Sequence, residues 1–152
     1  MANSNIRKST EREERSINPI IRLLSKIDGW MMKHAKLRLV ARSAPALLLT
    51  TIGRKSGQPR TTPVLYLRDG EAIVVVASKG GLPNHPLWYS NLEANANVEV
   101  EVDGQKMAML ARRATEEEKQ RLWPRLVGMY PDFANYQART DRDIPVIFLS
   151  PK

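Results

Sequence analysis

Two Asp-Gly pairs constrain the fold of this chain more than any other feature of its sequence. Asp69-Gly70 and Asp103-Gly104 each separate two runs that are rich in apolar and β-branched residues. Asp-Gly favours the tight two-residue turns that join antiparallel strands, because both positions accept a positive φ. We therefore predict two β-hairpins and a mainly antiparallel sheet. The expected strands of these hairpins are 61–68, 71–78, 98–102 and 106–112.

Two further apolar runs extend the sheet at both ends. Ala46–Ile52 precedes the first hairpin and Ile144–Leu149 follows the second, and each has the length of a buried strand. The segment 87–96 between the hairpins predicts a short helix. Six strands with few helices indicate an α+β fold that is mainly β, arranged as a small closed or partly closed barrel.

Helix signals are concentrated between the second hairpin and the last strand. Thr115 precedes Glu118 by three residues, which is the pattern of a capping box at a helix start. Pro124 is expected to bend or divide that helix, since proline cannot donate the backbone hydrogen bond. Pro131-Asp132 opens a second helical stretch that runs to Arg139.

Charge and hydropathy divide the chain into three segments. Residues 1–16 are polar and expected to be flexible, 17–42 form a basic helical segment, and 43–152 form the barrel. The net charge is +8, and residues 1–42 carry ten Lys or Arg against four acids, or +6 of that total.

The basic helical segment has two interpretations. Apolar residues recur at spacings of three and four from Ile17 to Met31, with Arg22, Lys26 and Lys33 off that stripe and Trp30 near its end. Such a helix either packs on the core of its own domain or lies on an anionic membrane surface. A membrane contact through residues 17–33 is therefore one hypothesis, and a packed helix is the other.

Composition excludes several kinds of chemistry. The chain has no cysteine and two histidines, His34 and His85, so we expect no disulfide, no thiol nucleophile and no metal site. It lacks a serine-nucleophile elbow, a complete phosphate-binding loop and the glycine fingerprint of a nicotinamide-binding fold. No apolar run has membrane-spanning length and the first residues are polar, so we expect a cytoplasmic protein.

Cations gather in the expected turns. Gly53–Gly57 encloses Arg54, Lys55 and Ser56, and Arg60 follows. Lys79 leaves the third expected strand at the end of the sheet where this turn lies, since two antiparallel reversals return the chain to that end. The pattern predicts a pocket rim for phosphate or carboxylate groups. The alternative is a basic turn that is merely solvated.

Two aromatic clusters are candidates for pocket walls. Trp88 lies in Pro86–Asn91 at the start of the short helix, and Tyr130, Phe133 and Tyr136 share one face of the last helix. Each cluster is equally compatible with the packing of a core.

These motifs, taken together, resemble the deazaflavin-dependent nitroreductase family. The matching stretches are LLLTTIGRKSGQPRTTP at 47–63, VASKGG at 76–81, PLWYSNL at 86–92 and MYP at 129–131, within a resemblance that covers about residues 17–150. The resemblance implies a split β-barrel of the FMN-binding type. It also implies use of coenzyme F420, a deazaflavin that carries a phosphate and an oligoglutamate tail. Members reduce quinones such as menaquinone, and some reduce nitroimidazoles.

The resemblance also assigns roles to residues. It places the anionic part of the cofactor on Arg54, Lys55, Ser56 and Arg60. It places the cofactor ring and its surroundings on Thr61, Thr62, Pro63, Val64, Ala77, Ser78, Lys79, Gly80, Leu87, Trp88 and Asn91. It places the acceptor beside Ser78, Tyr130, Phe133 and Tyr136, and Ser78, Tyr130 and Tyr136 are the expected catalytic residues because their hydroxyls can donate to developing negative charge.

The sequence therefore predicts an F420-dependent quinone reductase whose partner is a small quinone, with no nucleic acid bound and with a dimer as one option. Leu65 and Phe133 stand where a nitroimidazole-activating relative has tyrosine, which favours quinones over nitroaromatic acceptors. The alternatives are reduction of an activated alkene or other xenobiotic, a non-catalytic cofactor carrier, and a basic nucleic-acid-binding domain. The last is disfavoured because the cations lie in turns and near the N-terminus, with no helix suited to reading bases.

Overall fold

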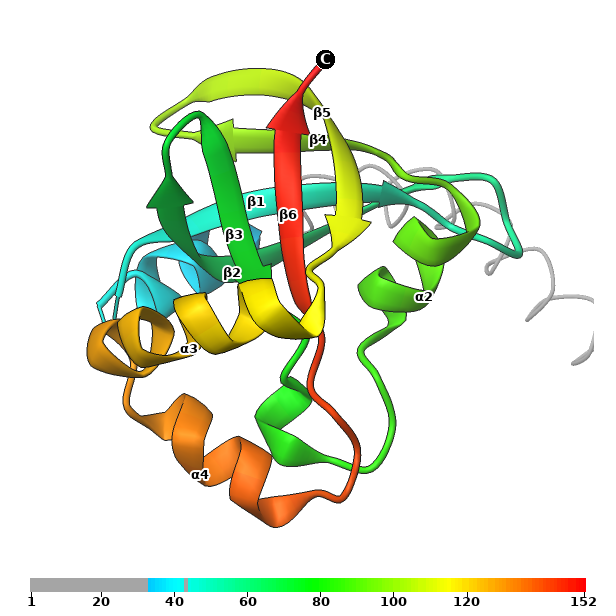
Figure 1. Ribbon diagram of the computed structural model, residues 1–152. Helices are drawn as coiled ribbons and strands as arrows, with labels where there is room; N and C mark the ends of the chain where they lie inside the picture. Colours follow the sequence, from blue (N-terminus) through cyan, green and yellow to red (C-terminus); the bar gives the residue numbers. More distant parts are fainter. Residues whose placement is uncertain (1–32, 43) are drawn as a thin grey trace, which may run out of the picture. The chain divides into compact units, whose positions relative to one another are not determined.

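The barrel unit accounts for most of the structure. The computed structural model describes residues 33–42 and 44–152, and residues 36–152 form one compact unit. The six strands wrap into a closed barrel, and Figure 1 shows helices at one end and one side of it. All neighbouring strands are antiparallel and close the barrel in the order β1-β2-β3-β6-β5-β4. The predicted barrel of six antiparallel strands is thereby confirmed.

The strands and helices follow the predicted order. The strands are β1 Ala46–Ile52, β2 Pro59–Asp69, β3 Ala72–Val76, β4 Asn97–Val102, β5 Gln105–Arg113 and β6 Val146–Pro151. The helices are the 3₁₀ turn η1 Lys79–Gly81, α2 Leu87–Ala94, α3 Glu116–Met129 and α4 Asp132–Arg139. Residues 33–40 are helical, whereas the rest of the predicted 17–42 segment up to residue 32, and all of 1–16, lie outside the described residues. Within the described part of the chain, no helix is both long and apolar enough to cross a bilayer.

Two strands are buried on both faces, which explains their unbroken apolar sequences. In β3, Ile73 and Val75 point into the barrel, whereas Val74 and Val76 pack outside it. In β6 the same alternation places residues 147 and 149 inside and residues 146 and 148 outside. Because side chains alternate across a strand, such strands need a cover on their outer face.

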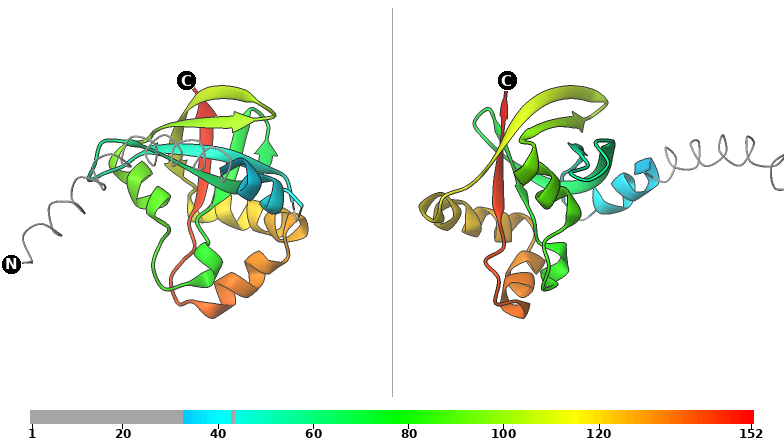
Figure 2. Two further views of the ribbon diagram at one scale, coloured as in Figure 1. Left: turned by 180° about the vertical axis from the view of Figure 1, so that it is seen from behind. Right: turned by 90° about the vertical axis from the view of Figure 1, so that its right-hand side faces the viewer.

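The cover is the helix pair α3 and α4. Leu122 and Leu126 of α3 and Phe133 of α4 pack with the outer residues of β3 and β6. Both views in Figure 2 place the helix pair at the same end of the barrel. At fully buried positions each large apolar side chain stabilises the fold by about 1.5–3 kcal/mol.

Helix α3 differs from its prediction at Pro124. The predicted capping box is present: the Glu118 amide donates to Thr115 Oγ1 (3.2 Å) and the Thr115 amide donates to Glu118 Oε1 (3.0 Å). The expected division at Pro124 is wrong, because one helix continues through it. The carbonyl that loses its partner belongs to Gln120, an exposed residue, so water can satisfy it.

The two hairpin turns use their Asp-Gly pairs differently: one loop begins at the aspartate of the pair and the other begins one residue later, at the glycine. Asp103 and Gly104 are the loop residues of the β4–β5 turn, with positive φ of 50° and 79°, as predicted. In the β2–β3 turn the closing pair is Asp69 and Ala72, so the loop begins at Gly70 (φ 62°) and not at Asp69. Asp69 instead accepts hydrogen bonds from Arg121 and Arg125 of α3, which lower the pKa of its carboxyl group.

The unequal lengths of β2 and β3 open the barrel locally. Their pairing reaches only from Asp69↔Ala72 to Tyr66↔Val75, whereas β2 continues with β1 back to Pro59. The chain that leaves β3 therefore separates from β2 beside residues 62–65. This separation creates the space that the candidate site occupies.

Candidate functional site

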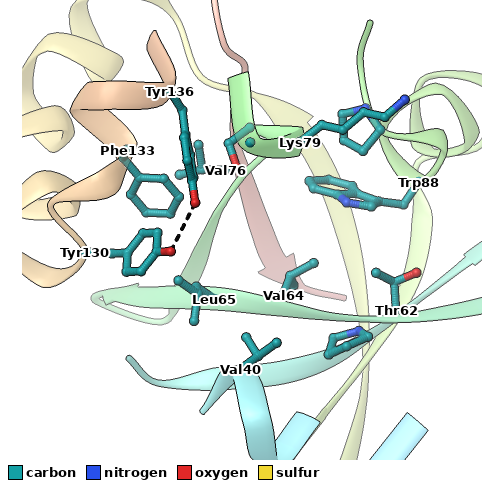
Figure 3. A pocket seen from close by; sticks show the side chains of 14 residues that line it. Val40, Thr62, Val64, Leu65, Val76, Lys79, Trp88, Tyr130, Phe133 and Tyr136 are labelled. Carbon is teal, nitrogen blue, oxygen red and sulfur yellow. Dashed lines mark hydrogen bonds between the residues drawn. The ribbon is translucent and has the colours of Figure 1, made fainter. Parts of the chain in front are cut away.

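A pocket of about 260 Å³ lies where β2 and the end of β3 separate. Figure 3 shows its floor, formed by Thr62, Val64 and Leu65 of β2, between aromatic side chains on one side and Trp88 with Lys79 on the other. The lining residues come from β2, the end of β3, the loop that follows it, the start of α2 and the α3–α4 region. They are Val40, Thr62, Pro63, Val64, Leu65, Val76, Ser78, Lys79, Gly80, Pro86, Trp88, Tyr130, Phe133 and Tyr136.

The aromatic wall is formed by the predicted trio. Tyr130 ends α3 and Phe133 and Tyr136 belong to α4, so their spacing of three brings the rings together. The Tyr130 and Phe133 rings meet edge to face at 5.0 Å, and Phe133 and Tyr136 at 6.4 Å. Phe133 is buried and anchors the wall, whereas the two tyrosines face the pocket (Figure 3).

The two tyrosine hydroxyls bond to each other. Their oxygens are 3.1 Å apart, and this bond, followed by burial, raises the pKa of Tyr130 above its usual range. The Tyr130 hydroxyl therefore stays protonated at neutral pH. Since one hydroxyl donates to the other, the second retains a free O–H that can donate to a bound molecule.

The opposite wall carries the only cation of the lining residues that the structure describes. Lys79 has a positive φ of 44°, which is uncommon for a residue with a side chain and is found often at functional sites. Ser78 begins the η1 turn without using its side chain as a helix cap. Its hydroxyl is therefore not engaged in capping the turn, and the residue lines the pocket together with Lys79.

Trp88 serves both the core and the pocket. The residue is 8% exposed and packs with the apolar interior of the barrel, yet one face of its ring lines the pocket. An aromatic ring fixed in this way offers a rigid flat surface against which a planar group can stack. Trp88 thus belongs to the core, as one interpretation of the sequence expected, and it also lines the pocket.

The basic turn adjoins the start of β2. Arg54, Lys55 and Arg60 are exposed, and among the described residues no carboxylate forms an ion pair with them. Ser56 Oγ accepts a weak hydrogen bond from Arg60 Nη2 at 3.5 Å. Arg60 is two residues before Thr62, so the turn leads directly into the pocket floor.

Asn91 holds this turn in place. Its Oδ1 accepts the Arg54 backbone amide at 3.1 Å, and its Nδ2 donates to the hydroxyl of Thr51 at 3.2 Å. Asn91 and Thr51 are the buried polar residues of the described chain. Because Asn91 follows Trp88 by three residues on α2, the same helix positions the turn and one pocket wall.

Ten of the predicted site residues line the pocket and the others surround it. The ten are Thr62, Pro63, Val64, Ser78, Lys79, Gly80, Trp88, Tyr130, Phe133 and Tyr136. Arg54, Lys55, Ser56 and Arg60 lie in the basic turn, Thr61 bonds to Thr50 between strands, Ala77 is buried, Leu87 is exposed and Asn91 supports the turn. The expected rim thus has two parts, the turn before the floor and Lys79 beside it.

Four lining residues were not among the predicted site residues. Val76 and Pro86 begin two of the matching stretches and Leu65 marks a difference from a relative, but none of them was assigned a role; Val40 belongs to no motif and gave no signal of a site. A second cavity of about 230 Å³ shares Val40, Leu65 and Tyr130 with the pocket and is also lined by Leu39. The pocket therefore continues into an apolar groove.

Comparison with known proteins agrees with this geometry. A family model described as F420H(2)-dependent quinone reductase matches residues 26–151. An F420H(2)-dependent quinone reductase of Mycobacterium tuberculosis is 44% identical over 109 residues, which is 70% of this chain and 73% of that protein. A solved F420-H2 dependent reductase (FDR-A) is 40% identical with a TM-score of 0.65, covering 70% of this chain and 94% of the other. A structure described as a domain-swapped dimer is 34% identical with a TM-score of 0.65, covering 81% and 98%.

Proposed function

Because this chain belongs to the F420H(2)-dependent quinone reductase family, we propose that it is an oxidoreductase that uses reduced coenzyme F420 to reduce a quinone in the pocket beside β2. The observation that carries the proposal is the arrangement of this pocket. A cationic turn, without a carboxylate partner among the described residues, leads into a floor bounded by Trp88 and Lys79 on one side and by hydroxyl-bearing aromatic residues on the other.

The residues present fit the cofactor. Its anionic phosphate and tail require cations free of carboxylate partners, and Arg54, Lys55 and Arg60 meet that requirement among the described residues. Its planar ring requires an apolar surface for stacking, and Trp88 and Pro63 are among the residues that line the pocket. When bound, the reduced coenzyme supplies a hydride, so the protein needs to supply binding, orientation and electrostatics.

The chain's own hydroxyls can stabilise the charge that develops on the acceptor, and solvent supplies the proton that completes the quinol. Reduction of a quinone to a quinol takes one hydride and one proton, and negative charge develops on a quinone oxygen as the hydride arrives. Ser78 and the Tyr130–Tyr136 pair can donate hydrogen bonds to that oxygen. On the same side of the pocket the buried Phe133 ring packs edge to face against the Tyr130 ring, which holds Tyr130 in place.

A direct assay tests the activity. We expect the purified protein to oxidise reduced F420 in the presence of menadione, a quinone without a tail, and to bind F420 more tightly than FMN. Binding without turnover would support a cofactor carrier, turnover of an activated alkene alone would change the substrate class, and tight DNA binding that weakens with salt would support a nucleic-acid-binding domain. Each of these results would contradict the proposed reaction.

Ser78 should act on the acceptor. Replacing Ser78 with alanine removes a donor aimed at developing charge, so turnover should fall by about tenfold or more while F420 affinity stays close to that of the wild type. The matched serine control is Ser150→Ala, because Ser150 lies at the far end of β6. Gln137→Ala would not serve, since the Gln137 side chain donates to the Arg142 carbonyl beside the pocket. Unchanged turnover in Ser78→Ala would remove this hydroxyl from the mechanism.

The apolar groove favours a quinone with an isoprenoid tail, such as menaquinone. Leu39, Val40 and Leu65 extend the apolar surface away from the pocket. Val40→Asp should therefore raise the KM for a tailed quinone and leave the KM for menadione close to that of the wild type, because only the tail would reach the groove. Equal changes for both quinones would contradict this assignment.

Nitroaromatic compounds should be poor acceptors. Leu65 and Phe133 both line the pocket, and neither can donate a hydrogen bond to a nitro group. We expect nitroimidazole reduction to be much slower than quinone reduction. Phe133→Tyr should make the difference between the two rates smaller.

A tailed quinone resides in a bilayer, so the protein has to reach a membrane surface from the cytoplasm. The sequence of residues 17–33, with Arg22, Lys26 and Lys33 beside an apolar stripe, favours reversible binding to anionic lipid at about 1 kcal/mol per cation. Co-sedimentation with anionic vesicles should decrease with salt and disappear when residues 1–33 are deleted. A protein that stays in the supernatant at low salt would contradict membrane binding.

A second copy of the chain is the proposed protein partner. Support comes from the similar structure described as a domain-swapped dimer. Light scattering during size-exclusion chromatography should give twice the mass of the 17.2 kDa chain, and a monomeric mass would contradict the proposal.

A further inference from the structure

Arg142 lies outside every motif in the sequence, in the connection between α4 and β6. Its guanidinium group donates hydrogen bonds to the backbone carbonyls of Ala77 (3.2 Å), Ser78 (2.7 Å) and Leu82 (2.9 Å). These three carbonyls belong to the segment 77–82, which carries Ser78 and Lys79 into the pocket. One side chain therefore fixes the whole course of this segment.

A fourth contact of the Arg142 guanidinium group reaches the residues that follow this segment in the loop. Arg142 Nη1 lies 3.1 Å from Nδ1 of His85. Because a guanidinium group can only donate, Nδ1 accepts and the neutral imidazole carries its proton on Nε2. The His85 ring in turn packs on Tyr89 of α2, with ring centroids 4.6 Å apart.

The backbone of Arg142 is itself tied to the aromatic wall. Its amide donates to Thr140 Oγ1 (3.2 Å), and its carbonyl accepts from Gln137 Nε2 (2.9 Å). Gln137 directly follows Tyr136 on α4. Gly81 and Tyr136 also approach closely, since a Cβ atom on Gly81 would lie 2.5 Å from the Tyr136 carbonyl oxygen.

We propose that Arg142 is a positioning residue that sets the distance between the Ser78–Lys79 wall and the Tyr130–Tyr136 wall. This inference rests on the proposed function, in which Ser78 of the first wall and the Tyr130–Tyr136 pair of the second donate hydrogen bonds to the same acceptor. Hydride transfer requires the reacting atoms at about 3–3.5 Å, and a displacement of about 1 Å can lower a rate by about a hundredfold. A planar guanidinium group that donates hydrogen bonds to three carbonyls resists such a displacement better than a single hydrogen bond does.

A role in stability alone makes a different prediction. Loss of Arg142 would then lower the melting temperature and leave kinetic constants unchanged at temperatures where the protein is folded. A positioning role lowers kcat in the folded protein, because the groups stay present but lose their relative placement. Affinity for F420 should change little, since the cations Arg54, Lys55 and Arg60 lie in a separate turn.

The test compares Arg142→Met and Arg142→Lys with Arg112→Met. Arg112 pairs with Glu118 at 2.8 Å and lies over the Phe148 ring, outside the pocket lining, so it controls for loss of a structured arginine. We expect Arg142→Met to lower kcat with menadione by about tenfold to a hundredfold, Arg142→Lys to fall between it and the wild type, and Arg112→Met to retain wild-type kcat. Folding of each variant is checked by circular dichroism and by its melting temperature.

Two outcomes would overturn the inference. A folded Arg142→Lys protein with wild-type kcat would show that the several hydrogen bonds of the guanidinium group are unnecessary for turnover. This result would overturn the inference even if Arg142→Met fails to fold. Amide hydrogen exchange gives a reading independent of activity: Arg142→Lys should accelerate exchange in both 77–85 and 132–139, and Arg112→Met in neither. Unchanged amide exchange of residues 132–139 in Arg142→Lys would contradict the link between the two walls. A wild-type protein without turnover would contradict only the proposed function.

Discussion

At the scale of single residues, Asn91 shows how one side chain serves a site without facing it. The resemblance assigned Asn91 to the cofactor, and in the structure its amide group bonds to the Arg54 amide and to the buried Thr51 hydroxyl. These bonds hold the backbone from which Arg54 and Lys55 project. An amide side chain is suited to this position because it both accepts and donates.

Asn91→Leu should therefore weaken both the fold and cofactor binding. The change leaves the Arg54 amide and the Thr51 hydroxyl without partners, at a cost of about 1–3 kcal/mol of unfolding free energy. We expect a lower denaturation midpoint and a higher Kd for F420, measured by fluorescence titration. Asn95→Leu is the matched control, since Asn95 caps the end of the same helix and its side-chain oxygen accepts hydrogen bonds from Asn97, away from the Arg54 amide and Thr51. An equal loss of F420 affinity in this variant would contradict the role of Asn91.

His85 should make the stability of the protein sensitive to mildly acidic pH. Burial, followed by the positive charges of Arg142 and Arg113, lowers the pKa of His85 below its ordinary value of 6.5, and the charge of Glu93 opposes this shift only in part. A histidine whose folded pKa is lowered is neutral in the native state, so its contribution is present above the unfolded pKa and is lost as the pH falls below it.

We expect the melting temperature to decrease as the pH falls from about 7.5 to about 5, with part of that decrease due to His85. His85→Asn keeps an acceptor near the position of Nδ1 but does not titrate, so the variant should show a smaller decrease. Identical pH profiles for the two proteins would exclude His85 as the source.

At the scale of elements, the contact between η1 and α4 depends on one glycine. Gly81 has a φ of 77°, and a Cβ atom there would lie 2.5 Å from the Tyr136 carbonyl oxygen and 2.9 Å from its Cα. Both the backbone conformation and the space exclude a side chain. Gly70 has a similar φ of 62° but open space around it.

Gly81→Ala should consequently be more damaging than Gly70→Ala. Each change places alanine in the left-handed region at about 1–2 kcal/mol, but only the first also pushes α4 away from the pocket. We expect Gly81→Ala to lose more stability in urea denaturation and to raise the KM for menadione. Equal losses with unchanged kinetics would show that the backbone conformation is the whole effect.

The elements also show how far the sequence determines the outcome. Ala46–Ile52 was predicted to the residue because its apolar run ends at Gly53, whereas β3 was predicted to reach Ser78 and ends at Val76. Local propensity cannot reveal where β2 and β3 separate, since that depends on pairing with β1 and β6. The aromatic trio could be predicted because its spacing is local in the sequence. The role of Arg142 could not, because its partners lie about 60 residues away in the chain.

At the scale of the whole molecule, the net charge of +8 bears on binding of an anionic cofactor. Surface charges act over roughly a Debye length, about 8 Å at physiological ionic strength. The Kd for F420 should therefore rise as salt is increased from about 0.05 to about 0.5 M, whereas the KM for neutral menadione should stay nearly constant. Titrations at several salt concentrations check this difference, and parallel changes in both constants would contradict an electrostatic role of the basic turn.

The helix pair that covers β3 and β6 links inactivation to aggregation. Helix α4 supplies the aromatic wall, and the same helix shields strands whose outer faces carry Val74, Val76 and Phe148. A thermal fluctuation that detaches it would abolish turnover and expose β-forming apolar segments that associate readily with those of other molecules. Heated samples should therefore lose activity irreversibly and in step with light scattering, and a bound quinone that holds the aromatic residues in place should delay both.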